Sequence, residues 1–404
     1  MLKHLNGLFA GLFCVTAALA EPALPTLRGD LDDAIDKAIV DQRLVGAVVL
    51  VMHDGKFVYR RAAGYADRES KTKMQEDTIF RLSSVSKPIV VAAAMALVDQ
   101  GKLRLDQPVT DWLPDFRPAL PNGETPAITI RQLLNHTAGL SYGFLENPNG
   151  PYHQFGVSDG MDESRVSLEE ETRRVSAAGL AYEPGKGWGY SVAIDVLGNV
   201  ISSAAGKPLP DVVHDLVTKP LRMTDTGFSI RSKARLATPY VDGNPAPGVM
   251  KDPQVVPFAE FAGIRFSPSR TLGKDFFPSG GAGMVGTAGD VARFLDNVRQ
   301  GGQPVLRQAT ARSMMANQTA DFPINLYGPG WGFGFGGAVL RDPALAKTPQ
   351  SAGTWAWGGV YGHSWFVDPA RKLTVVVMTN TAFEGMAGKL PTDVRNAVYK
   401  NIRE

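Results

Sequence analysis

The feature that most constrains the fold is an apolar run, IVVAAAMALV (89–98), preceded by FRLSSVSKP (80–88). Pro88 is tolerated only in the first turn of a helix, where its missing N–H would have had no partner anyway. We therefore expect a helix that begins near Ser84 or Val85 and stops at Gly101. Because the run is apolar on every side, this helix is predicted to lie buried in the middle of the protein.

Polar residues at the start of this helix suggest nucleophilic catalysis. Ser84 and Lys87 are three residues apart and share one face of the first turn. A serine hydroxyl becomes a good nucleophile when a neighbouring group takes its proton, and a partly buried lysine can do so. Free N–H groups at the helix start can hold the oxyanion that forms on attack. On spacing alone the alternative is a plain helix cap.

The same spacing recurs at Ser70 and Lys73, inside the charged stretch DRESKTKMQED. We interpret this second copy as a solvated loop, since charge runs of this kind usually form exposed surface.

Strand patterns lie at both ends of the chain, and helical patterns dominate between them. The composition, 44% hydrophobic and 20% charged, is that of a globular chain with ample material for a core. Strand-like runs occupy 46–55, 56–65, 353–360, 363–369 and 372–381, and helical patterns occupy 30–41, 287–302 and 390–402. We predict an α/β (α+β type) fold, with one antiparallel sheet built from both chain ends and flanked by helices. The sheet part would span about 21–83 and 285–404, a mostly helical insertion about 84–284, and a cleft would lie between them.

The first twenty residues have the parts of a secretory signal peptide in order. Lys3 supplies the positive end, residues 7–19 the apolar segment, and Ala18-Leu19-Ala20 a small-residue cleavage site. The alternative is a buried N-terminal helix. Cys14, the only cysteine, falls in this segment, so residues 21–404 would form one catalytic domain without thiol chemistry. The sequence thus predicts a secreted or periplasmic protein with no membrane anchor.

Several function classes are disfavoured by the sequence. The net charge is +2 with both signs interspersed, which gives no basic cluster for nucleic acid. The six histidines never approach a metal-ligand spacing, so no metal is expected. Gly-x-Gly-x-x-Gly occurs at 281–286 and 332–337, but neither copy opens a βαβ unit, so no cofactor is expected. The oligomeric state is left open.

Further motifs follow Ser84-x-x-Lys87 in order. They are LLNHTAGL (133–140), EPGKGWGYSVAIDVLG (183–198), SGGAGMVGTAGDVARF (279–294) and YGPGWGFGFGG (327–337). Together they resemble the serine β-lactamase and penicillin-binding-protein superfamily, whose first motif is Ser-x-x-Lys at the start of a central helix. The resemblance covers nearly the whole chain after residue 20 and implies a β-lactamase-like fold.

Two motifs depart from the penicillin-recognising members. Their second motif has an asparagine where this chain has Val192, in Tyr190-Ser191-Val192, and their third-motif Lys-Thr-Gly is replaced by Trp357-Gly358-Gly359. Losing one charge-assisted contact to a substrate carboxylate is worth about 1.5–3 kcal/mol, or roughly 10- to 150-fold in binding. Tyr-Ser-Val with Trp-Gly-Gly resembles the family VIII carboxylesterases, and a neutral ester would lose nothing by these changes.

The resemblance implies roles for individual residues. Ser84 would be the nucleophile, Lys87 the group that accepts its proton, and Tyr190 the partner that relays protons to the leaving group and activates water. Which of Lys87 and Tyr190 is the acylation base is left open. The oxyanion hole would be the backbone N–H groups of Ser84 and Val360, and Trp357, Gly358 and Gly359 would contact a small-molecule ester.

Other conspicuous residues are interpreted as structural. Trp331, Phe333, Phe335 and Trp355 alternate along strands and are expected in the core. Ser191 only imitates a nucleophile elbow. We expect His136 to make hydrogen bonds within its turn and assign no role to His363.

The preferred function is an exported serine carboxylesterase that cleaves short-chain esters through an acyl-serine intermediate. The alternatives are a β-lactamase or D,D-peptidase, for which Arg341 or another cation would have to replace the missing lysine, and an acyltransferase of the same fold. A penicillin-binding sensor or a catalytically inactive binding module is the alternative from a different class.

Overall fold

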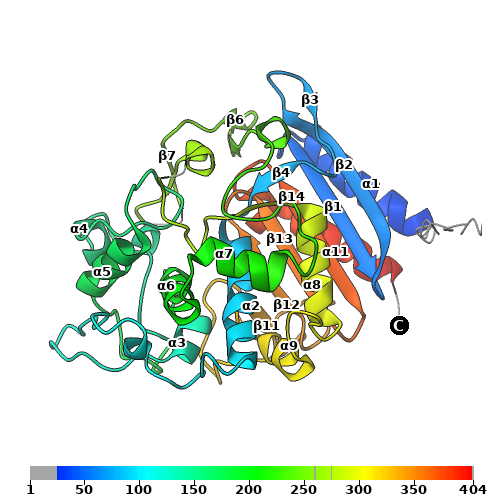
Figure 1. Cartoon of the computed structure of the whole chain (residues 1–404). Helices are drawn as coiled ribbons and strands as arrows, with labels where there is room; N and C mark the ends of the chain where they lie inside the picture. The colour runs from blue at the N-terminus through cyan, green and yellow to red at the C-terminus, as the bar shows by residue number, and fades with distance from the viewer. Residues whose placement is uncertain (1–24, 259–260, 274, 403–404) are drawn as a thin grey trace, which may run out of the picture.

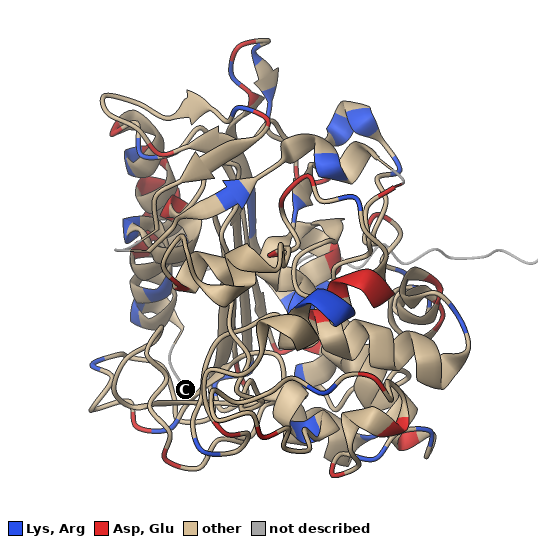
Figure 2. Cartoon of the chain, turned by 90° about the vertical axis from the view of Figure 1, so that its left-hand side faces the viewer, with Lys and Arg blue, Asp and Glu red and all other residues tan. Residues whose placement is uncertain are grey.

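The fold is described from a computed structural model over residues 25–258, 261–273 and 275–402. The predicted signal segment, residues 1–20 with Cys14, lies outside these ranges. Within them no helix is long and apolar enough to cross a membrane. Basic and acidic residues are mixed along the elements in Figure 2, as the interspersed charges of the sequence indicate.

The framework is an eight-stranded sheet in which neighbouring strands are antiparallel. In spatial order its strands are β10 (Trp331–Phe333), β11 (Ala338–Leu340), β12 (Trp355–Gly359), β13 (His363–Asp368), β14 (Leu373–Thr379), β1 (Gly46–His53), β2 (Lys56–Asp67) and β3 (Thr72–Lys73). β1 and β14 pair from Ala47 opposite Thr379 to His53 opposite Leu373. The prediction that both chain ends build one antiparallel sheet is confirmed.

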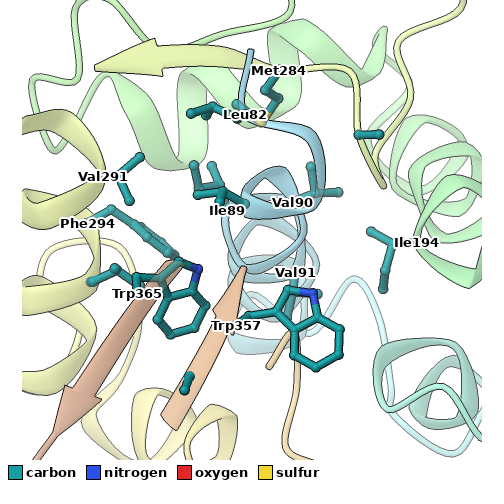
Figure 3. Close-up of a cluster of buried hydrophobic side chains, with 14 of the residues drawn as sticks. Leu82, Ile89, Val90, Val91, Ile194, Met284, Val291, Phe294, Trp357 and Trp365 are labelled. Atoms are coloured by element: carbon teal, nitrogen blue, oxygen red, sulfur yellow. The ribbon is translucent and has the colours of Figure 1, made fainter. Parts of the chain in front are cut away.

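Helices cover both faces of this sheet (Figure 1). The outer face carries α1 (Pro25–Val40), α10 (Glu384–Ala387) and α11 (Lys389–Asn401), and the inner face carries α2 (Ser86–Asp99), α8 (Ala288–Arg299) and α9 (Gln308–Met314). Consecutive strand residues point to opposite faces of a sheet, so Trp365 and Phe366 of β13 pack against the helices on opposite faces. Phe366 stacks on Tyr399 of α11 with ring centroids 5.9 Å apart. Trp365 lies in the inner core with Phe294 of α8 (Figure 3).

Apart from α2, which packs on the sheet, the chain between β4 (Ile79–Arg81) and β9 (Val285–Thr287) forms the other half of the molecule (Figure 1). β4 and β9 pair antiparallel, so the chain enters and leaves this half at one place. Its elements are α3 (Ile130–Leu134), α4 (Pro151–Gln154), α5 (Leu168–Ala178), α6 (Ala193–Ala205), α7 (Leu209–Val213), and the strand pairs β5 (Tyr240–Val241) with β6 (Gly248–Val249) and β7 (Gln254–Val256) with β8 (Ile264–Phe266). The division of the chain at about 84 and 285 stays a prediction.

The central helix α2 agrees with the sequence prediction. A 3-10 turn at Ser83–Val85 leads into the helix, which ends at Asp99, and Gly101 has a φ of 72° just beyond it. The residues from Ser86 to Leu97 are all buried. Figure 3 shows apolar side chains around the helix from strands on one side and helices on the others. The polar residues at its start are therefore held inside the molecule.

Candidate active site

Ser84 lies in the tight turn that precedes α2. The preceding residue, Ser83, has a φ of 43°, which is unusual for a residue other than glycine. Its hydroxyl accepts a hydrogen bond from the N–H of Tyr361 at 3.5 Å, and its side chain is fully buried. The turn is thus fixed by the chain segment that follows β12, while Ser84 itself lines a cavity.

Lys87 is fully buried in the first turn of α2, and its side chain reaches back to Ser84. Its Nζ donates to three oxygens: the hydroxyl of Ser84 at 3.1 Å, the hydroxyl of Tyr142 at 2.8 Å and the carbonyl of Gly281 at 2.9 Å. An ammonium group has three N–H donors. These three acceptors satisfy all of them and fix the nitrogen in one position.

Tyr190 completes the constellation from the other half of the molecule. Its hydroxyl donates to Ser84 Oγ at 2.6 Å, which brings together Ser84, Lys87 and Tyr190 as the sequence predicted. It lies in the loop just before α6, and its ring is 5.1 Å from that of His136 and 5.2 Å from that of Trp357. Packed aromatic rings therefore set the direction of the hydroxyl.

Tyr142 is a contact of Lys87 that sequence analysis missed. The nitrogen of Lys87 lies 4.6 Å from the ring centroid of Tyr190 and 5.2 Å from that of Tyr142, so two aromatic rings enclose the cation. Burial raises the pKa of the Tyr142 phenol well above its usual value, which keeps it a neutral hydroxyl. The only sequence signal was its place two residues after the HTAGL segment (136–140).

Ser84 opens into a cavity of about 590 Å³ with a largely aromatic wall. Aromatic residues line it from several elements, namely Phe144, Tyr190, Phe258, Tyr327, Trp331, Trp357, Trp365 and Phe366. Such a surface suits an apolar ligand with few polar groups.

Trp357 lies at the cavity, as the sequence predicted. It stacks on Tyr327 with centroids 5.3 Å apart and meets Phe333 edge-on at 5.2 Å. Of the residues expected in the core, Phe333, Phe335 and Trp355 are fully buried, whereas Trp331 also lines the cavity.

The two glycines after Trp357 have different surroundings. Gly358 lines the cavity, as does Val360, but Gly359 is not among the lining residues. A Cβ on Gly359 would lie 2.5 Å from Ser83 Oγ and 2.6 Å from the carbonyl oxygen of Leu82. A glycine is thus required for β12 to approach the turn that carries Ser84, and this approach brings Val360 to the same cavity as the nucleophile.

The cavity continues from Ser84 across the outer face of the sheet. The sheet residues that line it there include the small Ala356, Gly358 and Ser364, and α11 lines it as well. One cation, the half-buried Arg395 of α11, is among the residues that line it. Arg341, the cation considered from sequence, is not a lining residue, because its guanidinium binds Asp321 and the carbonyl of Ala320.

The hydrogen bonds of His136, Ser191 and His363 are structural, but that of the His136 ring reaches Ser191, outside the turn in which it was expected. His136 is fully buried, contacts the hydroxyl of Ser191 at 3.1 Å, and burial holds its pKa well below the usual value. Ser191 therefore faces His136 and does not line the cavity. The Nε2 of His363 lies 2.8 Å from the carbonyl of Arg81, and burial lowers the pKa of His363 to about 4.

The described ranges contain no group of three or more His, Cys, Asp or Glu residues arranged to hold a metal ion. The Gly-x-Gly-x-x-Gly segment at 281–286 contributes to the site through the Gly281 carbonyl, which accepts a hydrogen bond from Lys87. Lys87 and Tyr190 both hydrogen-bond Ser84 Oγ, an arrangement that can activate a serine.

The fold and this constellation agree with the family comparison. The Beta-lactamase family model matches residues 31–399, and the chain belongs to this family. The resemblance read from the sequence motifs is confirmed.

Two relatives are more specific. The chain is 48% identical to Esterase EstB of Burkholderia gladioli over 392 residues, which covers 95% of this chain and 100% of the relative. The solved structure of "EstCE1, a hydrolase with promiscuous acyltransferase activity" superposes with a TM-score of 0.89 at 47% identity, over 93% of this chain and 98% of that one. Simvastatin synthase (LovD) from Aspergillus terreus shares the fold at a TM-score of 0.72 and 21% identity, with coverage of 93% and 98%.

Proposed function

We propose that this protein is a serine carboxylesterase that cleaves short-chain esters through an acyl-serine intermediate. The observation that carries the proposal is the position of Ser84 Oγ, which lies 3.1 Å from Lys87 Nζ and 2.6 Å from the Tyr190 hydroxyl at the edge of an aromatic cavity. The 48% identity to Esterase EstB supports it.

Acylation begins when Ser84 Oγ attacks the ester carbonyl and loses its proton. As an ammonium, Lys87 has no free lone pair, so it can act as base only as the amine; Tyr190 can act as base only as the phenolate. The carbonyl electrons move to oxygen, and the N–H groups of Ser84 and Val360 would hold this oxyanion. Collapse of the intermediate expels the alcohol, which takes a proton from Tyr190 or Lys87. Water then repeats the sequence on the acyl-serine.

The substrate preference follows from the cavity wall. By the motif resemblance, Trp357 stands where the penicillin-recognising members have the lysine of Lys-Thr-Gly, and its neighbours are Tyr327 and Phe333. An uncharged ester with a small apolar acyl group has no charge that would have to be buried without a partner in such a site. We therefore expect neutral esters to be preferred over anionic amides.

The test is hydrolysis of p-nitrophenyl butyrate beside a chromogenic cephalosporin. Ester turnover that disappears in Ser84→Ala, and persists in the matched Ser70→Ala variant, supports the proposal. Dominant cephalosporin turnover by the native protein would mean that a cation such as Arg395 serves the substrate carboxylate, and the substrate preference would be wrong. Ester turnover that survives in Ser84→Ala would refute Ser84 as nucleophile.

We further propose that the protein is exported and that residues 1–20 are removed. The support is the order of Lys3, the apolar segment and Ala18-Leu19-Ala20 in the sequence. N-terminal sequencing of protein expressed in a bacterium with an intact periplasm should give Glu21 as the first residue. An unprocessed N-terminus in the cytoplasmic fraction would contradict export.

A second activity, acyl transfer to alcohols, is favoured by one comparison. EstCE1, at 47% identity, is described as a hydrolase with promiscuous acyltransferase activity. If an alcohol competes with water for the acyl-serine, added butanol should yield butyl butyrate from p-nitrophenyl butyrate. Butyrate as the sole product at every butanol concentration would exclude it.

A further inference from the structure

Asp195 is a buried carboxyl group that the reaction described above does not use. It lies in the first turn of α6, five residues after Tyr190, and only 1% of its surface is exposed. A buried carboxylate is costly unless several donors compensate it. Its contacts therefore indicate what it is for.

The contacts of Asp195 lead to the loop that serves Lys87. Its Oδ1 accepts a hydrogen bond from the hydroxyl of Ser279 at 2.5 Å and from the N–H of Gly281 at 3.2 Å. The carbonyl of the same Gly281 accepts the hydrogen bond from Lys87 Nζ at 2.9 Å. Asp195 thus binds the N–H of Gly281, and Lys87 binds its carbonyl oxygen.

The second oxygen of Asp195 lies near the hydroxyl of Tyr142, which accepts a hydrogen bond from Lys87. A Cβ on Gly281 would lie 2.6 Å from Asp195 Oδ2 and 3.0 Å from the Tyr142 hydroxyl, so these two atoms border the same spot. Oδ2 itself has no hydrogen-bond partner among the described residues. A buried acceptor without a partner is unusual and calls for an explanation.

The electrostatic surroundings of Asp195 are mixed. Burial raises its pKa, and the Ser279 hydrogen bond and the positive charge of Lys87 oppose that rise. Arg270 also lowers the pKa of Asp195, whereas Asp195 in turn helps to raise the pKa of Glu171. Among the described residues no carboxylate accepts a hydrogen bond from Lys87 Nζ, and the Gly281 peptide links Lys87 to Asp195.

We propose that Asp195 is a positioning residue for Lys87, a role that rests on the proposed esterase function. It fixes the 279–283 loop so that the Gly281 carbonyl receives one proton of Lys87. When the proton of Ser84 moves to the Lys87 amine as the Oγ–carbonyl bond forms, the charge of Asp195 stabilises the resulting ammonium. The proton later leaves with the alcohol.

The test compares Asp195→Asn and Asp195→Ala with a matched control, Glu171→Gln. Glu171 is also 1% exposed and also has one oxygen without a partner among the described residues, but it contacts the N–H of Ser158 and not the 279–283 loop. The asparagine keeps an acceptor for Gly281 and loses only the charge. We expect kcat to fall about 10-fold in Asp195→Asn and about 100-fold in Asp195→Ala, the range of a lost charge-assisted hydrogen bond.

KM separates this role from a structural one. Asp195 does not line the cavity, so KM should stay within about 3-fold in both variants. Glu171→Gln should keep the native kcat. Native kcat in folded Asp195→Asn and Asp195→Ala, a change confined to KM, or an equal loss in Glu171→Gln would each overturn the proposal. Should Asp195→Ala not fold, Asp195→Asn and Ser279→Ala still decide it, since Ser279→Ala removes the shorter bond to Oδ1.

A readout without ester turnover keeps this inference distinct from the proposed function. The rate at which a neutral alkylphosphonofluoridate labels Ser84, followed by mass spectrometry, reports on activation of the serine alone. Slower labelling in Asp195→Asn than in Glu171→Gln supports the role, and equal rates contradict it. A native protein that is labelled at Ser84 but hydrolyses no ester would instead count against the esterase function.

Discussion

The chain contains the Ser-x-x-Lys spacing twice, and the two copies have opposite surroundings. Ser84 and Lys87 begin a buried helix, and the lysine nitrogen reaches the serine at 3.1 Å. In the second copy Ser70 bonds Thr72 instead, and Lys73 lies 4.0 Å over the ring of Tyr65 on an exposed edge strand.

The difference shows what the spacing needs to become chemistry. A helical turn places the two side chains on one face, whereas the turn at Ser70 and the strand at Lys73 separate them. Burial then removes water as a competitor, so Lys87 must bond to protein oxygens. Position in the fold, and not spacing, distinguishes the two copies.

The largest expected effect comes from removing the two lysines in turn. Lys87→Ala should lower kcat/KM by about 100- to 10,000-fold, the contribution of a general acid–base group, because Ser84 loses its basic partner. Lys73→Ala should leave ester hydrolysis unchanged. Steady-state kinetics with p-nitrophenyl butyrate measure both, and a similar loss in the two variants would break the comparison.

A smaller effect is expected for the phenols beside each lysine. Tyr190→Phe removes only the hydroxyl that donates to Ser84 Oγ, which should lower kcat roughly 10- to 150-fold. Tyr65→Phe, beside Lys73, is the matched control and should retain native kcat. An unimpaired Tyr190→Phe would show that Lys87 alone moves the protons.

The approach of β12 to the Ser84 turn can be tested through a glycine. Gly359→Ala places a methyl group against the Leu82 carbonyl and Ser83 Oγ, so the free energy of unfolding should fall by about 1–3 kcal/mol and kcat should drop with it. Gly289→Ala in α8 meets no atom within 4 Å and should stabilise the protein by up to about 1 kcal/mol. Urea denaturation measures both changes, and a neutral Gly359→Ala would disprove the tight contact.

Burial also separates two neighbouring glutamates, with the smallest expected effect. Burial raises the pKa of Glu171 to about 9, whereas Arg173 and Arg174 lower that of the partly exposed Glu170 to about 2. Folded Glu171 holds a proton that the unfolded chain releases above its ordinary pKa of about 4.3, so stability falls as pH rises from there toward 9.

Glu171→Gln should remove this dependence and stabilise the protein at pH 7 by about 1–3 kcal/mol. Glu170 has its lowered pKa from ion pairs, so Glu170→Gln should not stabilise. Thermal unfolding of both variants across pH 5 to 9 is the measurement. The stability gain of Glu171→Gln over the native protein should be larger at pH 7 than at pH 5. An equal gain at the two pH values would contradict a protonated Glu171.

Local patterns predicted much of this fold. Pro88 and the apolar run located α2, and strand-like runs at both chain ends located β1, β2 and β12 to β14. The short strands β5 to β8 were not predicted, because two- and three-residue strands have no periodicity to detect.

The candidate site was predicted only in part, because local motifs are visible in the sequence and long-range contacts are not. Ser84, Lys87 and Tyr190 stand in recognisable motifs. Tyr142 lies outside the recognised motifs, and although Asp195 and Gly281 lie inside two of them, their connection to Lys87 depends on long-range packing that the motifs do not reveal. The place of Gly359 against the Ser83 turn likewise depends on a contact between segments more than two hundred residues apart.

The most direct test of the account is to identify the residue that carries the acyl group. Protein turning over p-nitrophenyl butyrate is quenched in acid, digested, and analysed by mass spectrometry. The account predicts a butyryl group on Ser84, which disappears from the Tyr190→Phe protein more slowly than from the native one. A butyryl group on Ser70 or Ser191, with Ser84 unmodified during turnover, would contradict it.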